Sequence, residues 1–230
     1  MARLARVIVP GLPHHVTQRG NRREPIFFET GDQDVYMDLL AEQIARRSVS
    51  VWAYCLMPNH VHLILTPTDE RGIGLAVGEA HRRYTNFVNA RGRWTGHLFQ
   101  NRFASVAMDD AHLIAAARYV PMNPVRARLV ARPHDWPWSS ARAHLAGADD
   151  GLVAVAPLLD RIGDFAAFLA GGEDAAASHA LRTAETTGRP LGNEAFIADL
   201  ERILGRKLAR GRPGPKPKTG AGLDQPELWG

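Results

Sequence analysis

Two histidines, His60 and His62, are separated by one residue in the apolar segment PNHVHLIL at residues 58–65. Alternate residues of a β-strand share a face, so a strand here would place both imidazoles on one side, about 7 Å apart. That spacing allows both rings to converge on one metal ion. Such a pair also occurs as polar surface or as hydrogen-bonded core, so a metal site requires a third ligand and a nucleophile nearby.

A predicted helix after Asp110 supplies both candidates. Tyr119 and Asn123 are four residues apart, which places them on the same side of a helix, one turn from each other. Tyr119 lies off the apolar stripe of this helix, so its hydroxyl need not be buried. The alternative is a surface tyrosine followed by an Asn123 cap at the helix end. Pro121 lies between the two residues and predicts a kink or an early end of the helix.

The other tyrosines are rival nucleophiles. Tyr36 and Tyr54 fall within a predicted helix and a predicted strand, where core packing is the simpler role. Tyr84 follows Arg82 and Arg83 in a basic helix and could contact nucleic acid, so it is the second candidate.

The elements that position these residues alternate along the chain. Strands are expected at 14–18, 50–56, 60–66 and 103–108, and helices at 32–47, at 73–90 and from Ala111, with Asp110 as the N-cap. The order strand, helix, strand, strand, helix, strand, helix is the split βαβ pattern. We therefore expect an α+β, ferredoxin-like domain with an antiparallel sheet.

Four regions are predicted along the chain, with roles that rest in part on the family resemblance given below. Residues 1–145 form the predicted catalytic domain, and the Ala-, Gly- and Asp-rich residues 146–180 form a linker with short helices. Residues 181–210 form a small helical, DNA-binding extension with an amphipathic helix at 193–204. Residues 211–230 are predicted to be a disordered basic tail.

Charge and composition narrow the function. Hydrophobic residues make up 45% and charged residues 23% of the chain, which is typical of soluble globular proteins. No apolar run approaches the roughly 20 residues of a membrane span, and the single Cys55 excludes a disulfide within the chain. Basic residues without an intervening acid occupy residues 1–23, 80–108 and 205–218. Arginine fits phosphate oxygens, so these stretches favour a nucleic-acid partner over solvated surface. The expected location is the cytoplasm.

Several motifs in order resemble the HUH single-tyrosine transposases, and more narrowly the REP-associated tyrosine transposases. They are HVTQRGN at 15–21, HVH at 60–62, QNRF at 100–103, RY at 118–119, NPVR at 123–126 and DWPWSS at 135–140. The segment GRPLG at 188–192 resembles the C-terminal extension of many members. Arg128 stands where the family often has glycine.

The resemblance implies a metal-dependent enzyme that acts on single-stranded DNA beside a hairpin. His60, His62 and Asn123 would bind Mg²⁺ or Mn²⁺, and Tyr119 would attack a phosphodiester to give a 5′-phosphotyrosine link and a free 3′-hydroxyl. The enzyme would act as a monomer or a homodimer. A phenol with a pKa near 10 is mostly protonated at neutral pH, so help on the phosphate side suits this chemistry.

The predicted DNA contacts are arginines with nearby amide and aromatic groups, as in other single-strand binders. They are Arg19, Asn21, Arg22, Arg23, Arg82, Arg83, Arg91, Arg93, Trp94, Arg102, Arg210 and Arg212. The last two belong to RGRP, which weakly resembles an AT-hook core and is otherwise a nonspecific basic tail.

Two alternatives remain at this stage. One is a domesticated protein that binds DNA hairpins without cleavage. The other is a metal hydrolase that uses His60 and His62 on an unrelated substrate, although no paired carboxylates surround the motif.

Overall fold

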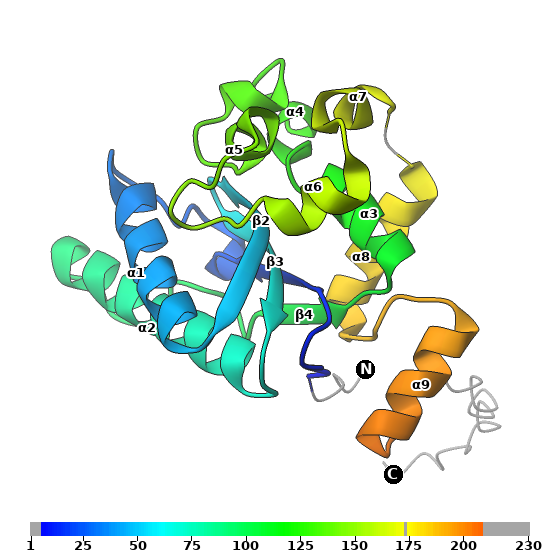
Figure 1. The fold of residues 1–230 in the computed structure, drawn as a ribbon. Helices are drawn as coiled ribbons and strands as arrows, with labels where there is room; N and C mark the ends of the chain where they lie inside the picture. The colour runs from blue at the N-terminus through cyan, green and yellow to red at the C-terminus, as the bar shows by residue number, and fades with distance from the viewer. Residues whose placement is uncertain (1–5, 173, 209–230) are drawn as a thin grey trace, which may run out of the picture.

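Four antiparallel strands form one sheet in the computed structural model, which describes residues 6–172 and 174–208 (Figure 1). The strands are β1 (His14–Arg19), β2 (Val49–Met57), β3 (His60–Pro67) and β4 (Ala104–Ala107), in the order β2-β3-β1-β4. Helix α1 (Asp32–Arg46) follows β1, α2 (Gly72–Gly92) follows β3, and α3 (Asp110–Tyr119) follows β4. This topology confirms the predicted ferredoxin-like α+β class.

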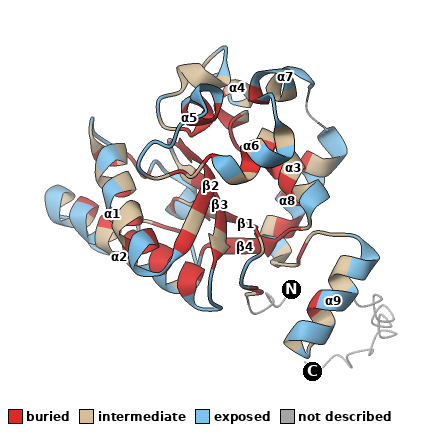
Figure 2. Cartoon of the chain, viewed as in Figure 1, coloured by how far each residue is buried: buried red, intermediate tan, exposed pale blue. Residues whose placement is uncertain are grey.

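Helices α1 and α2 cover one face of the sheet (Figure 2). Val16, Leu63 and Leu65 point from the strands into this layer and are fully buried. Tyr36 and Tyr84 fill the space between the helices, with their ring centroids 5.3 Å apart. Alternate residues of a strand point to opposite faces of the sheet. His60 and His62 therefore point to the face opposite this apolar layer.

The opposite face is covered by α3, α6 (Ala156–Ile162) and α8 (Ala175–Thr187). Ile64 of β3, Leu113 of α3, Leu158 of α6 and Leu181 of α8 are all fully buried in one cluster. Residues from the predicted linker and from the predicted extension therefore pack on the same sheet as the predicted catalytic domain. The domain boundaries at 145, 180 and 210 stay predictions.

Short elements complete the chain. They are the 3₁₀ turns η1 (Asn21–Arg23) and η2 (Pro133–Asp135) and the helices α4 (Asn123–Arg126), α5 (Ala141–Ala146), α7 (Phe165–Ala170) and α9 (Glu194–Leu204). Helix α9 packs Leu200 against Val7 and Val9, ahead of β1.

Later segments pair with both edges of the sheet, which leaves fewer unpaired backbone groups for other chains. At β2, the backbone N–H of Leu56 donates to Trp138 O at 2.8 Å, and the indole N–H of Trp136 donates to Leu56 O. The next residue, Ser139, forms an isolated antiparallel bridge with Cys55 of β2. At β4, the N–H of Leu191 donates to Ala107 O at 2.8 Å. The DWPWSS and GRPLG motifs thus have structural roles at the sheet edges.

Two local predictions about α3 have different outcomes. The N-cap is Asp109, whose carboxylate accepts the backbone N–H of His112 at 2.9 Å, and not Asp110, which is the first helical residue. Pro121 does end the helix early: α3 stops at Tyr119, and a separate short helix begins at Asn123. Within the described residues, no helix is both long and apolar enough to cross a membrane.

Candidate metal and nucleophile site

Residues on the α3-facing side of the sheet form the candidate site. The antiparallel register places Thr17 opposite His62 and Arg19 opposite His60, and His15 opposite Ile64. Directly opposed residues share a face, so all of these side chains point toward the same side. His60 and His62 lie with ring centroids 4.9 Å apart at an interplanar angle of 77°.

Each of these two histidines uses its Nδ1 atom in a local hydrogen bond. His60 Nδ1 lies 2.6 Å from Asn59 Oδ1, and His62 Nδ1 lies 3.0 Å from Nε2 of His15. Because Asn59 Oδ1 can only accept, His60 Nδ1 carries the proton and its Nε2 keeps a lone pair. Nε2 of His62 is buried and has no hydrogen-bond partner in the described part of the chain.

Burial keeps both rings neutral. It lowers the pKa of His60 to about 3, helped by Arg19 and Arg126, and it lowers the pKa of His62 well below 6.5. Neutral imidazole is the form that binds metal ions. The donor pair His60 and His62 therefore fits a divalent cation.

The Tyr119 ring lies beside His62 and His15. Its ring centroid lies 5.5 Å from that of His62 and 5.9 Å from that of His15, edge-on to both. The guanidinium carbon of Arg126 lies 3.8 Å from the centre of the phenol ring. Tyr119 is only 5% exposed although it lies off the apolar stripe of α3, because helix α8 packs against α3.

Opposing effects act on the phenol. Burial raises the pKa of Tyr119 above 10 and the nearby Glu185 carboxylate adds to this, while the cationic Arg126 and Arg182 lower it. Two guanidinium groups beside a phenol are suited to stabilise a phenolate and to hold a phosphate.

Asn123 is buried beside this group, but its amide is already hydrogen-bonded. Its Nδ2 donates to the backbone oxygen of Tyr119 at 3.1 Å and to that of Val120 at 3.2 Å. Its Oδ1 accepts from Arg126 at 2.6 Å. An amide oxygen has two lone pairs, so one remains for a cation.

The rival tyrosines lie away from the histidine pair, and their hydroxyls have other hydrogen-bond partners. Tyr84 is fully buried and its hydroxyl donates to Ile26 O at 2.8 Å. Tyr36 is also fully buried and pairs with His81 at 2.9 Å, and Tyr54 is 2% exposed and donates to Asp150 at 2.6 Å.

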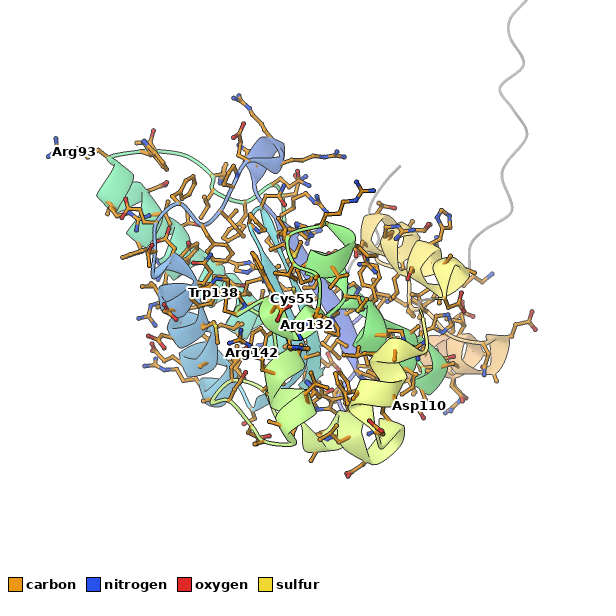
Figure 3. All side chains as sticks on the ribbon, turned by 90° about the horizontal axis from the view of Figure 1, so that it is seen from above. Cys55, Arg93, Asp110, Arg132, Trp138 and Arg142 are labelled. Carbon is orange, nitrogen blue, oxygen red and sulfur yellow. The ribbon has the colours of Figure 1, made fainter. Side chains whose placement is uncertain are left out.

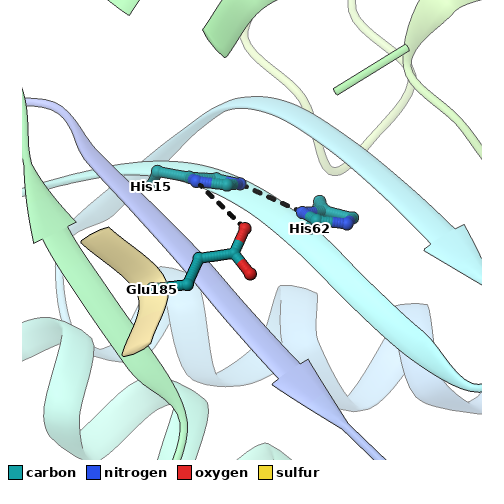
Figure 4. A group of neighbouring side chains, drawn as sticks. All are labelled: His15, His62 and Glu185. Carbon is teal, nitrogen blue, oxygen red and sulfur yellow. Dashed lines mark hydrogen bonds and ion pairs between the residues drawn. The ribbon is translucent and has the colours of Figure 1, made fainter. Parts of the chain in front are cut away.

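Sequence reasoning missed two residues of the site, His15 and Glu185. Ligand atoms of His15, His62 and Glu185 all lie within 4.8 Å of one another, an arrangement that could hold a metal ion (Figure 4). His15 had a detectable signal, since it alternates with Thr17 and Arg19 on the first strand. Glu185 had none, because it comes from α8, more than one hundred residues after the histidine pair.

Polar cavities begin beside this cluster. One of about 520 Å³ is lined by Glu185 of α8 and by residues of two segments, Thr17, Gln18, Arg19, Arg23, Gln100, Asn101 and Arg102. Neighbouring cavities of about 740 Å³ and 360 Å³ share Asn101 and Arg102 with it. Asn21 lines the larger of these two and Arg82 the smaller. The structure thus brings Arg19, Arg23 and Arg102 together around a cavity beside helix α8, which packs against the helix that carries Tyr119.

The remaining predicted DNA contacts are distributed differently. Arg82 pairs with Glu79, Arg83 with Glu42, and Arg91 with Asp32. Arg22 is exposed in η1, and Arg93 is exposed at the outer end of α2 (Figure 3). Trp94 is 52% exposed with its ring edge-on to Phe28. Arg210 and Arg212 lie outside the described residues.

Comparisons with known proteins identify the family and support the fold. Residues 9–123 match the family "Transposase IS200 like". A solved structure of a REP-associated tyrosine transposase bound to a REP hairpin is similar over 67% of this chain and 92% of its own, with a TM-score of 0.55 and 23% identity.

A candidate transposase from Deinococcus radiodurans R1 shares 19% identity over 52% of this chain and 95% of its own, with a TM-score of 0.37. No curated protein matches. The family match covers half of the sequence and includes both histidines, Tyr119 and Asn123, and the chain therefore belongs to the IS200-like transposase family.

Proposed function

We propose that this protein is a metal-dependent endonuclease and strand transferase that acts on single-stranded DNA beside a hairpin. The observation that carries the proposal is the meeting of Tyr119 with the His60–His62 pair on one face of the sheet. The hairpin is proposed as substrate because the structure at TM-score 0.55 is described as bound to one.

Tyr119 is the proposed nucleophile. Its phenol oxygen forms a bond to a backbone phosphorus while the bond from phosphorus to the 3′-oxygen breaks. The phenol proton leaves, and the 3′-oxygen takes up a proton to become a free hydroxyl. The product is a 5′-phosphotyrosine, which conserves the phosphodiester's energy so that attack by a 3′-hydroxyl can rejoin DNA.

His60, His62 and Asn123 are the proposed ligands of Mg²⁺ or Mn²⁺. When bound, such an ion supplies electrophilic stabilisation of the phosphoryl oxygens and the leaving oxygen. The two imidazoles fit this role through their available Nε2 atoms, and Asn123 through its remaining lone pair. Imidazole ligands suit Mn²⁺, whereas Mg²⁺ prefers oxygen ligands.

Basic groups along the polar cavities are proposed to hold the strand. Arg19, Arg23 and Arg102 line the cavity that reaches Glu185, so they are placed to contact phosphates that approach Tyr119. Asn21, Arg22, Arg82, Arg93 and Trp94 are proposed to extend these contacts. Arg83 and Arg91 would first have to leave carboxylate partners on α1.

A covalent adduct tests this function. A labelled hairpin oligonucleotide with a single-stranded flank is incubated with protein and Mn²⁺ and run on a denaturing gel. We expect a protein-linked band that is lost in Tyr119→Phe, while Tyr84→Phe, a matched change at a buried tyrosine, retains it.

Binding without an adduct in the wild type would instead support the hairpin-binding alternative. The 5% exposure of Tyr119 favours that alternative, because a phosphate must reach the phenol for cleavage. If the wild type shows neither binding nor an adduct, both the cleavage function and the hairpin-binding function are refuted.

A further inference from the structure

Three buried polar atoms in one small volume have no hydrogen-bond partner among the described residues. They are His62 Nε2, His15 Nδ1 and Glu185 Oε1. Leaving such atoms unsatisfied destabilises the folded state, so a cluster of three indicates a functional arrangement. His15 lies between the other two residues and links all three side chains.

The geometry of the two rings selects the first step. His15 and His62 are nearly coplanar, with an interplanar angle of 7°, and His15 Nε2 lies 3.0 Å from His62 Nδ1. A single proton bridges these nitrogens. If His62 donates it, its Nε2 carries a lone pair and is available to a cation together with Nε2 of His60. If His15 donates it, His62 Nε2–H is left as a buried donor without an acceptor.

Glu185 determines which of these two arrangements is favoured. When His62 donates, His15 must carry its own proton on Nδ1, and that atom lies 3.9 Å from Glu185 Oε1 (Figure 4). In its ionised form Glu185 can only accept, and its negative charge at this distance favours the protonated Nδ1 of His15. Burial raises the pKa of this carboxyl to about 7. If His15 donates the bridging proton instead, the lone pair of its Nδ1 faces a lone pair of Glu185 Oε1.

We propose that Glu185 of α8 is a positioning residue that acts through His15 to set the tautomer and orientation of the metal ligand His62. This inference rests on the metal site of the proposed function. Carboxylate and imidazole partners behind ligating histidines commonly have this effect. Glu185 lies outside the family match at residues 9–123, so this contribution comes from the part of the chain that follows the matched domain.

The packing of α8 supports a fixed position for Glu185. Leu181 and Ala184, on the same helix, are 0% and 4% exposed. The helix ends at Thr187 with its C-cap Gly188 in the left-handed conformation, at φ 69°. Leu191 then pairs with β4, which holds the chain after α8 to the edge of the same sheet.

Mn²⁺ affinity of the full-length protein without DNA tests the inference, with the electron paramagnetic resonance signal of free Mn²⁺ as the readout. Glu185→Gln keeps the side-chain shape but removes the purely accepting carboxylate. We expect it to weaken Mn²⁺ binding about ten- to one-hundred-fold. Glu194→Gln, an exposed carboxylate in the first turn of α9, is the matched control and should leave the affinity unchanged.

A double-mutant cycle with His15→Gln separates a positioning role from direct ligation. If Glu185 acts through His15, the double variant binds Mn²⁺ no more weakly than the weaker single variant. If the two effects multiply, Glu185 binds the ion independently and the inference is wrong. Spin-echo modulation from directly bound nitrogen should show two imidazoles in both single variants and one in His60→Ala.

The outcome also distinguishes this inference from the proposed function. Wild-type affinity in Glu185→Gln, with loss of binding in His62→Ala, would overturn the inference and leave the metal site intact. A wild-type protein that does not bind Mn²⁺ would overturn both.

Discussion

Replacing Leu181 by alanine tests whether α8 belongs to the same cooperative unit as the sheet. The Leu181 side chain is 0% exposed and lies in the cluster that contains Leu113 and Leu158. Removing three buried carbons from such a site costs about 2–5 kcal/mol, from lost apolar transfer plus the residual cavity. The middle of that range, about 3 kcal/mol, corresponds to a fall in Tm of roughly 6–12 °C for a chain of this size.

Thermal unfolding measured by circular dichroism and by tryptophan fluorescence is the assay. Ile203→Ala on α9 is the matched control, because Ile203 is 60% exposed and should change the free energy of unfolding by less than about 0.5 kcal/mol. Tryptophan reports on the sheet, since Trp52 of β2 belongs to the same cluster as Leu181. We expect both signals to shift together in Leu181→Ala.

Two results would refute this reasoning. A Tm equal to that of Ile203→Ala would show that α8 does not pack as described. An early transition seen by circular dichroism, with the fluorescence transition unchanged, would show that α8 unfolds separately from the sheet and is an appended module.

Further predictions concern pH and the arginines. Burial lowers the pKa of His14 from 6.5 to about 4, so the unfolded chain takes up a proton that the folded chain excludes. The contribution of neutral His14 to the free energy of unfolding is complete above pH 6.5 and declines as the pH falls toward 4. This histidine should account for about 2 kcal/mol of lost stability between pH 7 and pH 5. Urea unfolding at both values measures the loss, and an undiminished loss in His14→Gln would contradict this assignment. Arg91 donates twice to the buried Asp32, at 2.5 and 2.9 Å, whereas Arg93 is exposed. Arg91→Ala should therefore lower the Tm, whereas Arg93→Ala should leave it unchanged. In binding assays at 50 and 200 mM salt, Arg93→Ala should weaken the affinity for DNA and reduce the salt dependence of that affinity. Equal Tm values for the two variants would rule out a structural role for Arg91.

Most of the sheet and its flanking helices could be predicted from local sequence. Period-two alternation in 60–67 placed His60 and His62 on one face, because strand geometry depends only on neighbours in the chain. Pro121 likewise predicted the end of α3, since a missing N–H and a ring clash are local effects. The one-residue error at the N-cap arose because Asp109 and Asp110 are both good caps, and only the tertiary position of the strand end selects between them.

Contacts between distant segments could not be predicted in this way. The sequence presented Arg83 and Arg91 as DNA contacts, but the packing of α1 on α2 provides carboxylates for both. It gave no sign that α8 would pack against α3 and leave Tyr119 only 5% exposed.

The residue types and spacings of one short strand and one helix end were sufficient to select a histidine pair and a tyrosine as the candidate site of this protein. Only the tertiary structure decided that His15 and Glu185 join them. Antiparallel pairing and the return of α8 bring together residues whose separation along the chain leaves no local pattern.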